Sequence, residues 1–236
     1  MKIVSWNMNK RKNGTWNYLI NNINPDVALI QESSPISNNF DDFSYIEVDV
    51  KKNLKNTIYI KDKKYKNVEL NDKIGMGLNC VNINKKNFSI YLLSVYGNLS
   101  FSPRLDFALG ELLTHCINDL KKKFSANNII IAGDFNMDRR MDDNPTGTKF
   151  SKKGERRCNN FFNEILKNGF IDCLKIKYPN FVRTHTNNSS PDFPWQIDHF
   201  FASTNLIDKF DDIRVIEDTE TRKLSDHYPI VAKFNL

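Results

Sequence analysis

Features of membrane and secreted proteins are missing from this sequence of 236 residues. No uninterrupted apolar stretch is long enough to cross a bilayer, and the N-terminal MKIVSWNMNK contains no apolar segment before a cleavage site. The four cysteines are widely scattered without a Cys-x-x-Cys spacing, which fits neither a zinc ribbon nor a disulfide framework. We therefore expect reduced, mostly buried thiols in a cytoplasmic protein that is not bound to a membrane.

Linkers, low-complexity tracts and short-period repeats are missing as well. Hydrophobic residues make up 40% of the chain and aromatic residues 12%, which is enough for a packed core and argues against intrinsic disorder. The chain is longer than the roughly 100–200 residues usual for one domain, yet sandwiches and barrels of this length commonly form a single unit. We predict that residues 1–236 form one α/β domain, and we expect a monomer.

Basic residues outnumber acidic ones, 34 to 28, which gives a net charge of +6. This charge favours polyanionic partners such as nucleic acid. The segment from Arg139 to Arg157 holds seven basic and three acidic residues, a local charge of +4. It is either a contact for a phosphate backbone or a solvated lysine-rich loop. Its candidate substrate-binding residues are Arg139, Arg140, Lys152 and Lys153.

The hydrophobic pattern predicts alternating strands and helices. The apolar runs within residues 27–32 and 128–133 are typical of strands covered on both faces. Apolar residues at helical spacing predict helices at residues 16–23, 104–124 and 157–167, the last stopped by Gly169. Shorter strands are expected at residues 2–6, 57–60, 77–83, 88–96 and 230–234. Since the second half repeats the pattern of the first, two halves could pack sheet on sheet with helices outside.

Polar side chains lie at the ends of several of the most apolar strands. In α/β sheets, ligands bind outside the strand ends, because loops converge there on a rigid support. Each polar cluster alone also fits a simple surface turn. Five clusters together indicate a functional site, and their residues are Asn7, Gln31-Glu32, Asp134 with Asn136, Asp198, and Ser225-Asp226-His227.

The residue types in these clusters indicate metal-assisted phosphoester hydrolysis. Carboxylate and amide oxygens are hard ligands, suited to Mg²⁺ or Mn²⁺ rather than to Zn²⁺. A histidine beside them can donate a hydrogen bond to a phosphate, and an aspartate can orient that histidine or activate a water molecule.

Six motifs carry a family resemblance that spans the chain from Trp6 to Ile230. In order, they are SWNMN, IQE, SVYGN, GDFN, WQIDHFFAS and SDHYPI. The ordered set resembles the endonuclease/exonuclease/phosphatase superfamily. The resemblance implies a four-layer α/β sandwich, with two mixed β-sheets face to face, helices outside and one active site at an end of the sandwich.

The resemblance also implies roles for individual residues. Glu32 resembles the principal metal ligand of the family, and Asn7 would support the metal and the phosphate. Tyr96 stands where the family places a Tyr or His against the phosphate. Asp134 and Asn136 resemble the pair that activates the attacking water and steadies the phosphate.

Three further residues complete the implied site. His227 resembles the phosphate-binding histidine of the family, and Asp198 resembles the aspartate that holds it in one tautomer. Asp226 resembles a carboxylate that contacts a metal directly or through water.

The sequence also departs from the apurinic endonucleases of this superfamily. Asn9 stands where these enzymes commonly have Asp, which argues against a second metal, and the segment VRTHTNN at residues 182–188 lacks their aromatic residues. Trp195 lies three residues before Asp198, as in some of them. We expect Asn9, Asn98 and Trp195 to contact the substrate.

Three functions agree with these residues to different degrees. The leading hypothesis is a Mg²⁺- or Mn²⁺-dependent phosphodiesterase acting on nucleic acid, as a DNA endonuclease or exonuclease. A second hypothesis keeps the chemistry and takes a small phosphoester, such as a nucleotide or a phosphoinositide-like head group. A third is a non-catalytic binding protein, which predicts that site residues are lost, whereas all are present.

Overall fold

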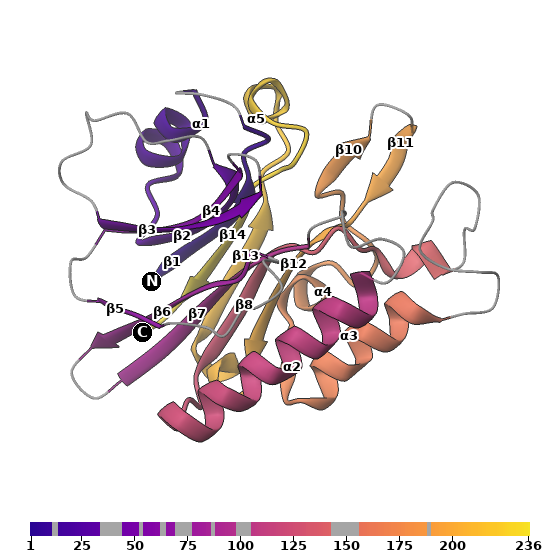
Figure 1. The fold of residues 1–236 in the computed structure, drawn as a ribbon. Coiled ribbons are helices and arrows are strands. Elements are labelled where there is room, and N and C mark those ends of the chain that lie inside the picture. Colours follow the sequence, from indigo (N-terminus) through magenta and orange to yellow (C-terminus); the bar gives the residue numbers. More distant parts are fainter. Residues whose placement is uncertain are drawn as a thin grey trace.

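The structure is a computed structural model of the chain. It describes residues 1–10, 14–33, 44–51, 54–61, 65–68, 77–85, 88–97, 105–142, 156–187 and 190–236. Two mixed six-stranded sheets lie face to face, with helices on their outer sides (Figure 1). This arrangement confirms the predicted four-layer α/β sandwich. No helix within these ranges has the length and apolar character needed to cross a membrane.

The first sheet combines strands from both ends of the chain. Its order is β13-β14-β1-β2-β4-β3, in which only β1 and β2 run parallel to each other. The N- and C-terminal ends therefore lie close together (Figure 1). The strands are β1 (Lys2–Asn7), β2 (Val27–Ser33), β3 (Ser44–Lys51), β4 (Leu54–Ile60), β13 (Phe210–Val215) and β14 (Ile230–Phe234).

The second sheet repeats this plan with one parallel pair at its centre. Its order is β5-β6-β7-β8-β12-β9, and β7 and β8 are the parallel pair. The strands are β5 (Tyr65–Asn67), β6 (Asn79–Lys85), β7 (Phe88–Tyr96), β8 (Ile129–Asp134), β9 (Phe170–Asp172) and β12 (Asp198–Ser203). A separate hairpin of β10 (His185–Asn187) and β11 (Ser190–Trp195) projects at the upper right of Figure 1.

Two long helices, α2 (Leu105–Phe124) and α3 (Arg157–Lys167), cover the second sheet (Figure 1). The predicted stop of the second of them is confirmed, since Gly169 has a φ of +85° just after its end. The remaining helical segments are short. They are α1 (Gly14–Asn17), η1 (Tyr18–Ile23), η3 (Arg139–Asp142), α4 (Cys173–Lys177), η4 (Thr204–Lys209) and α5 (Thr219–Leu224).

The helix predicted at residues 16–23 differs from a regular α-helix. The chain makes one short α-helical segment, α1, and then widens into the π-helical segment η1. It ends at Asn24, whose φ is +50° and whose N–H donates to Leu19 O. The wider turn keeps Trp16, Leu19 and Ile23 buried together against the first sheet.

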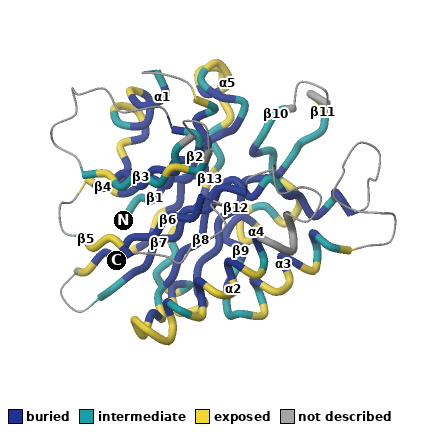
Figure 2. Tube along the Cα trace, in the orientation of Figure 1, coloured by how far each residue is buried: buried dark blue, intermediate teal, exposed yellow. Residues whose placement is uncertain are grey.

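The apolar run of strand β8 is continuous because both faces of the strand are covered. Ile129 and Ile131 pack between the second sheet and the helices, whereas Ile130 and Ala132 pack between the two sheets. Both faces of the strand are therefore inaccessible to solvent, and Figure 2 shows the central strands as buried. The four cysteines are buried free thiols, as predicted.

Candidate active site

The carboxyl ends of the two parallel pairs carry four of the candidate residues. Asn7 ends β1, Glu32 is the last residue but one of β2, Tyr96 ends β7 and Asp134 ends β8. Asp134 is also the register partner of Asp198, the first residue of β12. Since the two sheets face each other, these ends meet at one edge of the sandwich, and the side-chain contacts below follow from that meeting.

Glu32 sits in an irregular part of its strand. The register between β2 and β4 shifts between Ile30 and Ser33, and Glu32 has a φ of +49° in the left-handed region. Its Oε1 accepts a hydrogen bond of 2.7 Å from the Tyr96 hydroxyl, and its Oε2 is 3.9 Å from Lys10 Nζ. Bulges and left-handed residues other than glycine are concentrated at functional sites, where they re-aim a side chain. Sequence patterns did not predict this bulge.

Asp134 is held by two asparagine side chains. Asn7 Nδ2 donates to Asp134 Oδ2 at 2.9 Å, and Asn136 donates to the same carboxylate through its N–H at 2.8 Å and its Nδ2 at 3.0 Å. The Asp134 side chain is buried. Burial raises the pKa of Asp134 to about 7, although nearby His227 and the hydrogen bond from Asn7 act in the opposite direction.

His227 and Asp198 form a buried pair. His227 Nδ1 is 2.9 Å from Asp198 Oδ2 and 3.1 Å from Oδ1. This contact turns Nε2 toward Asp134, whose Oδ2 is 3.9 Å away. Burial lowers the pKa of His227, but the carboxylates of Asp198 and Asp134 outweigh it and raise the pKa to about 10. The imidazole is therefore held as a cation between two acidic groups.

Ser225 and Trp6 fix the backbone of the SDH segment. Ser225 Oγ donates to Asn7 O at 2.8 Å and accepts the N–H of His227 at 3.1 Å, while Trp6 Nε1 donates to His227 O at 2.9 Å. Polar residues are tolerated beside the apolar strand β14 because the neighbouring strand β1 and the candidate site satisfy their hydrogen bonds.

A second group of side chains surrounds Asp226. Asn9 Nδ2 donates to Asp226 Oδ1 at 2.8 Å, and His185 Nε2 is 3.7 Å from Asp226 Oδ2. The rings of His185 and His227 have centroids 4.4 Å apart. Burial raises the pKa of Asp226, but His185 and His227 outweigh it and lower the pKa to about 2. Sequence reasoning missed His185, because its place depends on a β-bridge to residue 227 that leaves no local pattern.

The donor atoms at this edge fit a hard divalent cation. Carboxylate and amide oxygens of Glu32, Asp226 and Asn7 are the donor types that Mg²⁺ and Mn²⁺ prefer. The side chains of Glu32 and Asp226 are 17% and 39% exposed, so solvent reaches both. In two groups of possible ligands that include a histidine, one ligand atom from each residue lies within 4.8 Å of the others. The groups are Asp134, Asp198 and His227, and His185, Asp226 and His227.

The structure does not bring Arg139 and Arg140 into this cluster. The Arg139 guanidinium is buried, 4.9 Å from the Phe162 ring centre, and donates to Asn163 at 3.1 Å. The Arg140 guanidinium lies over the rings of two phenylalanines and pairs with the buried carboxylate of Asp138. Both arginines therefore make internal contacts instead of forming a basic rim.

The other predicted substrate contacts have separate positions. Trp195 packs on the core of the second sheet and lies 4.5 Å from Phe193, measured between ring centres. Asn9 lies beside Asp226, as described above. Asn98, Lys152 and Lys153 lie outside the described residues.

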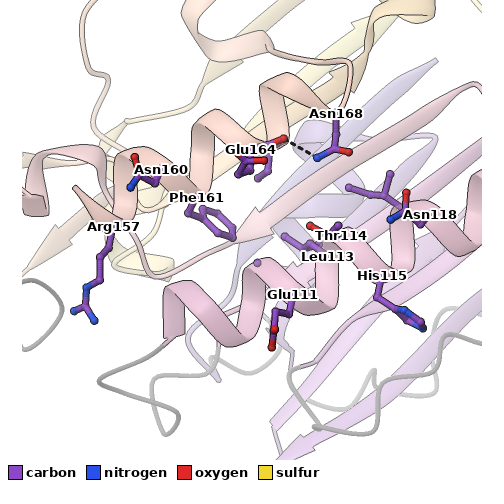
Figure 3. A pocket seen from close by; sticks show the side chains of 13 residues that line it. Glu111, Leu113, Thr114, His115, Asn118, Arg157, Asn160, Phe161, Glu164 and Asn168 are labelled. Carbon is purple, nitrogen blue, oxygen red and sulfur yellow. Dashed lines mark hydrogen bonds between the residues drawn. The ribbon is translucent and has the colours of Figure 1, made fainter. Parts of the chain in front are cut away.

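A groove of about 620 Å³ lies elsewhere, between α2 and α3 on the outside of the sandwich (Figure 3). None of the candidate residues lines it. Its polar side chains, including Glu111, His115 and Asn160, are spread along two helices. Because catalysis needs acid, base and ligand groups that converge, the edge with Asp134 and His227 is the better candidate active site.

Comparison with known proteins relates this geometry to a family. The sequence profile described as the Endonuclease/Exonuclease/phosphatase family matches residues 4–227. No curated protein matches the chain in sequence. Similar solved structures include a variant of the 3′ phosphatase NExo from Neisseria bound to a product DNA hairpin, with 21% identity, a TM-score of 0.73 and all of both chains covered.

Two apurinic (AP) endonuclease structures are similar as well. The enzyme LMAP from Leishmania major has 16% identity and a TM-score of 0.74, with 99% of this chain and 87% of that chain covered. The enzyme from Archaeoglobus fulgidus has 18% identity and a TM-score of 0.73, with all of both chains covered. At these identities the likeness establishes the fold.

Proposed function

Because the chain belongs to the Endonuclease/Exonuclease/phosphatase family, we propose that it is a divalent-metal-dependent phosphodiesterase that cleaves DNA as an endonuclease or an exonuclease. The observation that carries this proposal is the convergence of Asp134, Asp198 and His227 at one edge of the sandwich. The product DNA hairpin bound by the Neisseria 3′ phosphatase and the activity named for the two AP endonucleases support DNA as the substrate. The net charge of +6 agrees with a polyanionic substrate.

The proposed metal site consists of oxygen donors. Glu32 would be the principal ligand of Mg²⁺ or Mn²⁺, supported by Asp226 and by the amide oxygen of Asn7. When bound, the cation would supply charge neutralisation at a non-bridging phosphate oxygen.

Asp134 would act as the base that accepts a proton from the attacking water. Its pKa of about 7 is suited to this role, because a general base works best when its pKa is near the operating pH. Asn7 and Asn136 hold both of its oxygens by hydrogen bonds, so the carboxylate has one orientation. Asn136 Nδ2 also donates to Gly97 O at 2.9 Å, so Asn136 would act by holding Asp134 in place beside the phosphate.

His227 would stabilise the negative charge that grows on the phosphate. Asp198 holds Nδ1, so Nε2 remains to donate a hydrogen bond to a phosphate oxygen beside Asp134. The pKa of about 10 keeps this donor protonated at neutral pH. The Tyr96 hydroxyl donates its proton to Glu32, so Tyr96 would hold this carboxylate beside the phosphate.

A cleavage assay with and without Mg²⁺ tests the proposal. Plasmid, linear duplex, single-stranded DNA, a duplex with an abasic site, a duplex with a 3′ phosphate, RNA and a small phosphomonoester are compared. We expect cleavage of DNA by the wild type, loss of cleavage in Glu32→Ala and Asp134→Asn, and full cleavage in Glu164→Ala, which removes an exposed carboxylate of α3.

Two outcomes would contradict the proposal in different ways. Hydrolysis of the small phosphomonoester alone would retain the phosphoesterase chemistry and assign it to a small substrate. Wild-type cleavage by both Glu32→Ala and Asp134→Asn would show that the candidate active site is not the catalytic one.

A further inference from the structure

We propose that His185, Asp226 and His227 form a second metal site, selective for a nitrogen-binding transition-metal dication such as Zn²⁺ or Co²⁺. This site shares Asp226 with the oxygen site proposed at Glu32 and differs from it in its two imidazole ligands. It goes beyond the proposed function, and metal binding there does not require that the protein cleaves DNA.

The donor atoms lie close to the spacing that one ion requires. The ligating atoms of the three side chains lie within 4.8 Å of one another, and His185 Nε2 is 3.7 Å from Asp226 Oδ2. Two ligands of a tetrahedral zinc ion lie roughly 3.4 Å apart, because each bond is about 2.1 Å long. Small rotations of the side chains therefore bring the donors to bonding distance.

Hydrogen bonds already occupy one polar side-chain atom of Asp226 and one of His227. The second polar atom of each side chain therefore faces the proposed metal site. Asn9 occupies Asp226 Oδ1, so Oδ2 faces His185. Asp198 occupies His227 Nδ1, so Nε2 is the ring nitrogen that can bind a metal, which displaces the Nε2 proton into solvent. A histidine that binds a metal almost always donates its other N–H to a carboxylate or a carbonyl, and the pair of His227 and Asp198 has this arrangement.

The backbone fixes His185 opposite His227. Thr186 N–H donates to Asp226 O at 2.8 Å, and Tyr228 N–H donates to Thr184 O at 2.8 Å. These two bonds form an antiparallel bridge that pairs residues 185 and 227, so the two imidazoles lie side by side on facing segments. The site is therefore organised before any metal arrives.

The chemistry of the three donors decides the class of metal. Two imidazoles and one carboxylate suit Zn²⁺ and Co²⁺, whereas Mg²⁺ prefers oxygen donors only. The side chains of His185 and Asp226 are 16% and 39% exposed, so a water molecule can supply a fourth ligand. The alternative group of Asp134, Asp198 and His227 is less suited, because its His227 and Asp198 are already hydrogen-bonded to each other.

Metal binding at this site would also affect DNA cleavage, a consequence that rests on the proposed function. A transition metal on His227 Nε2 would keep this nitrogen from the phosphate. Zn²⁺ should therefore inhibit Mg²⁺-dependent cleavage, and His185→Ala should require at least about tenfold more Zn²⁺ for the same inhibition.

Titration of tag-free protein with Co²⁺ tests the site directly, read by the visible absorption that Co²⁺ shows with nitrogen ligands. We expect the wild type to bind one Co²⁺ with this absorption, and His185→Ala and His185→Gln to bind it at least about tenfold more weakly. His115→Ala removes an exposed imidazole of α2 and should bind as the wild type does. Thermal unfolding of each variant checks that it is folded.

Glu32→Ala separates this proposal from the proposed function. It should lose Mg²⁺-dependent cleavage and keep the Co²⁺ absorption of the wild type. Equal Co²⁺ binding by the wild type and both folded His185 variants would overturn the site, whatever the cleavage assay shows. Failure of the wild type to cleave DNA, with Co²⁺ binding that depends on His185, would overturn the proposed function alone.

Discussion

The side-chain amide of Asn7, at the end of β1, donates a hydrogen bond of 2.9 Å to Asp134 Oδ2, at the end of β8. The bond joins the two sheets where their parallel pairs end. It lowers the pKa of Asp134, against the larger effect of burial, which raises it. One amide thus contributes to both the position and the acidity of the proposed base.

Asn7→Ala should move the acid limb of the pH–rate profile to higher pH. Without the amide, the charged form of Asp134 loses a donor, so the pKa rises and a higher pH is needed to ionise the base. We also expect the free energy of unfolding to fall by about 1–3 kcal/mol, because a buried carboxylate loses a hydrogen-bond partner. The pH dependence of kcat and denaturant unfolding measure the two effects.

Asn128→Ala is the matched control for that variant. Asn128 Nδ2 donates to Ser89 O at 3.0 Å, near the opposite end of β7 and β8. The same type of bond is lost there, so stability should fall slightly and the pH profile should stay in place. A shift of equal size in both variants would show that Asn7 acts through the fold rather than on Asp134.

Asp198→Asn should move the alkaline limb of the profile to lower pH. After burial, which lowers the pKa of His227, Asp198 is the largest influence and raises that pKa. Removing its charge makes His227 lose its proton at a lower pH, so the donor to the phosphate is lost earlier as pH rises. We expect kcat to fall at least about 100-fold at neutral pH. An unchanged alkaline limb, measured from pH 6 to 10, would contradict the assignment of His227.

Tyr96→Phe should weaken the dependence on Mg²⁺ without changing the packing. Burial and the nearby Glu32 carboxylate raise the pKa of Tyr96 well above its usual range, so its hydroxyl stays a donor to Glu32. Its loss frees the carboxylate to rotate, and the apparent Mg²⁺ affinity or kcat should fall roughly 10- to 100-fold. Tyr91→Phe, on the same strand, is the control and should leave the Mg²⁺ titration unchanged.

Gly133→Ala should unfold the end of β8. A Cβ at Gly133 would lie 1.9 Å from Val95 O, in the parallel partner strand, and a backbone carbonyl there cannot move aside. We expect a loss of more than about 4 kcal/mol in the free energy of unfolding. Gly169→Ala meets no atom within 4 Å and has only the strain of its φ of +85°, so it should cost about 1–2 kcal/mol. Equal unfolding midpoints for the two variants would refute the steric explanation.

Arg140→Ala should lower stability and leave the salt dependence of DNA binding unchanged. It removes the ion-pair partner of Asp138, whose side chain is fully buried, and such a loss costs about 3–5 kcal/mol. A direct phosphate contact would instead change the slope of log K against log salt by about 0.9. Fluorescence anisotropy at several salt concentrations decides between the two roles.

Elements whose burial repeats regularly along the sequence were predictable. The runs within residues 27–32 and 128–133 are fully buried strands, and the apolar face of α2 from Leu109 to Leu120 is buried as its spacing indicates. The order of the motifs also predicted which residues end these strands. Such features depend on local periods of two or 3.6 residues, which the sequence contains.

Features set by contacts between distant segments were not predictable. The bulge at Glu32 depends on how β2 pairs with β4, and the place of His185 depends on a bridge to residue 227. Arg139 and Arg140 look like surface residues in a basic segment, yet an aromatic ring lies against each guanidinium, and that of Arg140 pairs with the buried carboxylate of Asp138. Charge in the sequence does not reveal which partners neutralise it.

The pairing of β1 with β14 also affects the order in which the protein matures during translation. The hydrogen bond from Trp6 to His227 joins residues 221 positions apart, so the ribosome must synthesise all the residues between them before it can form. Until then β1 is an unpaired edge on one side, and the histidine of the proposed active site is missing. A nascent chain that ends before residue 227 would therefore lack one residue of the proposed catalytic set, and the proposed activity would appear only after this residue has joined the sheet.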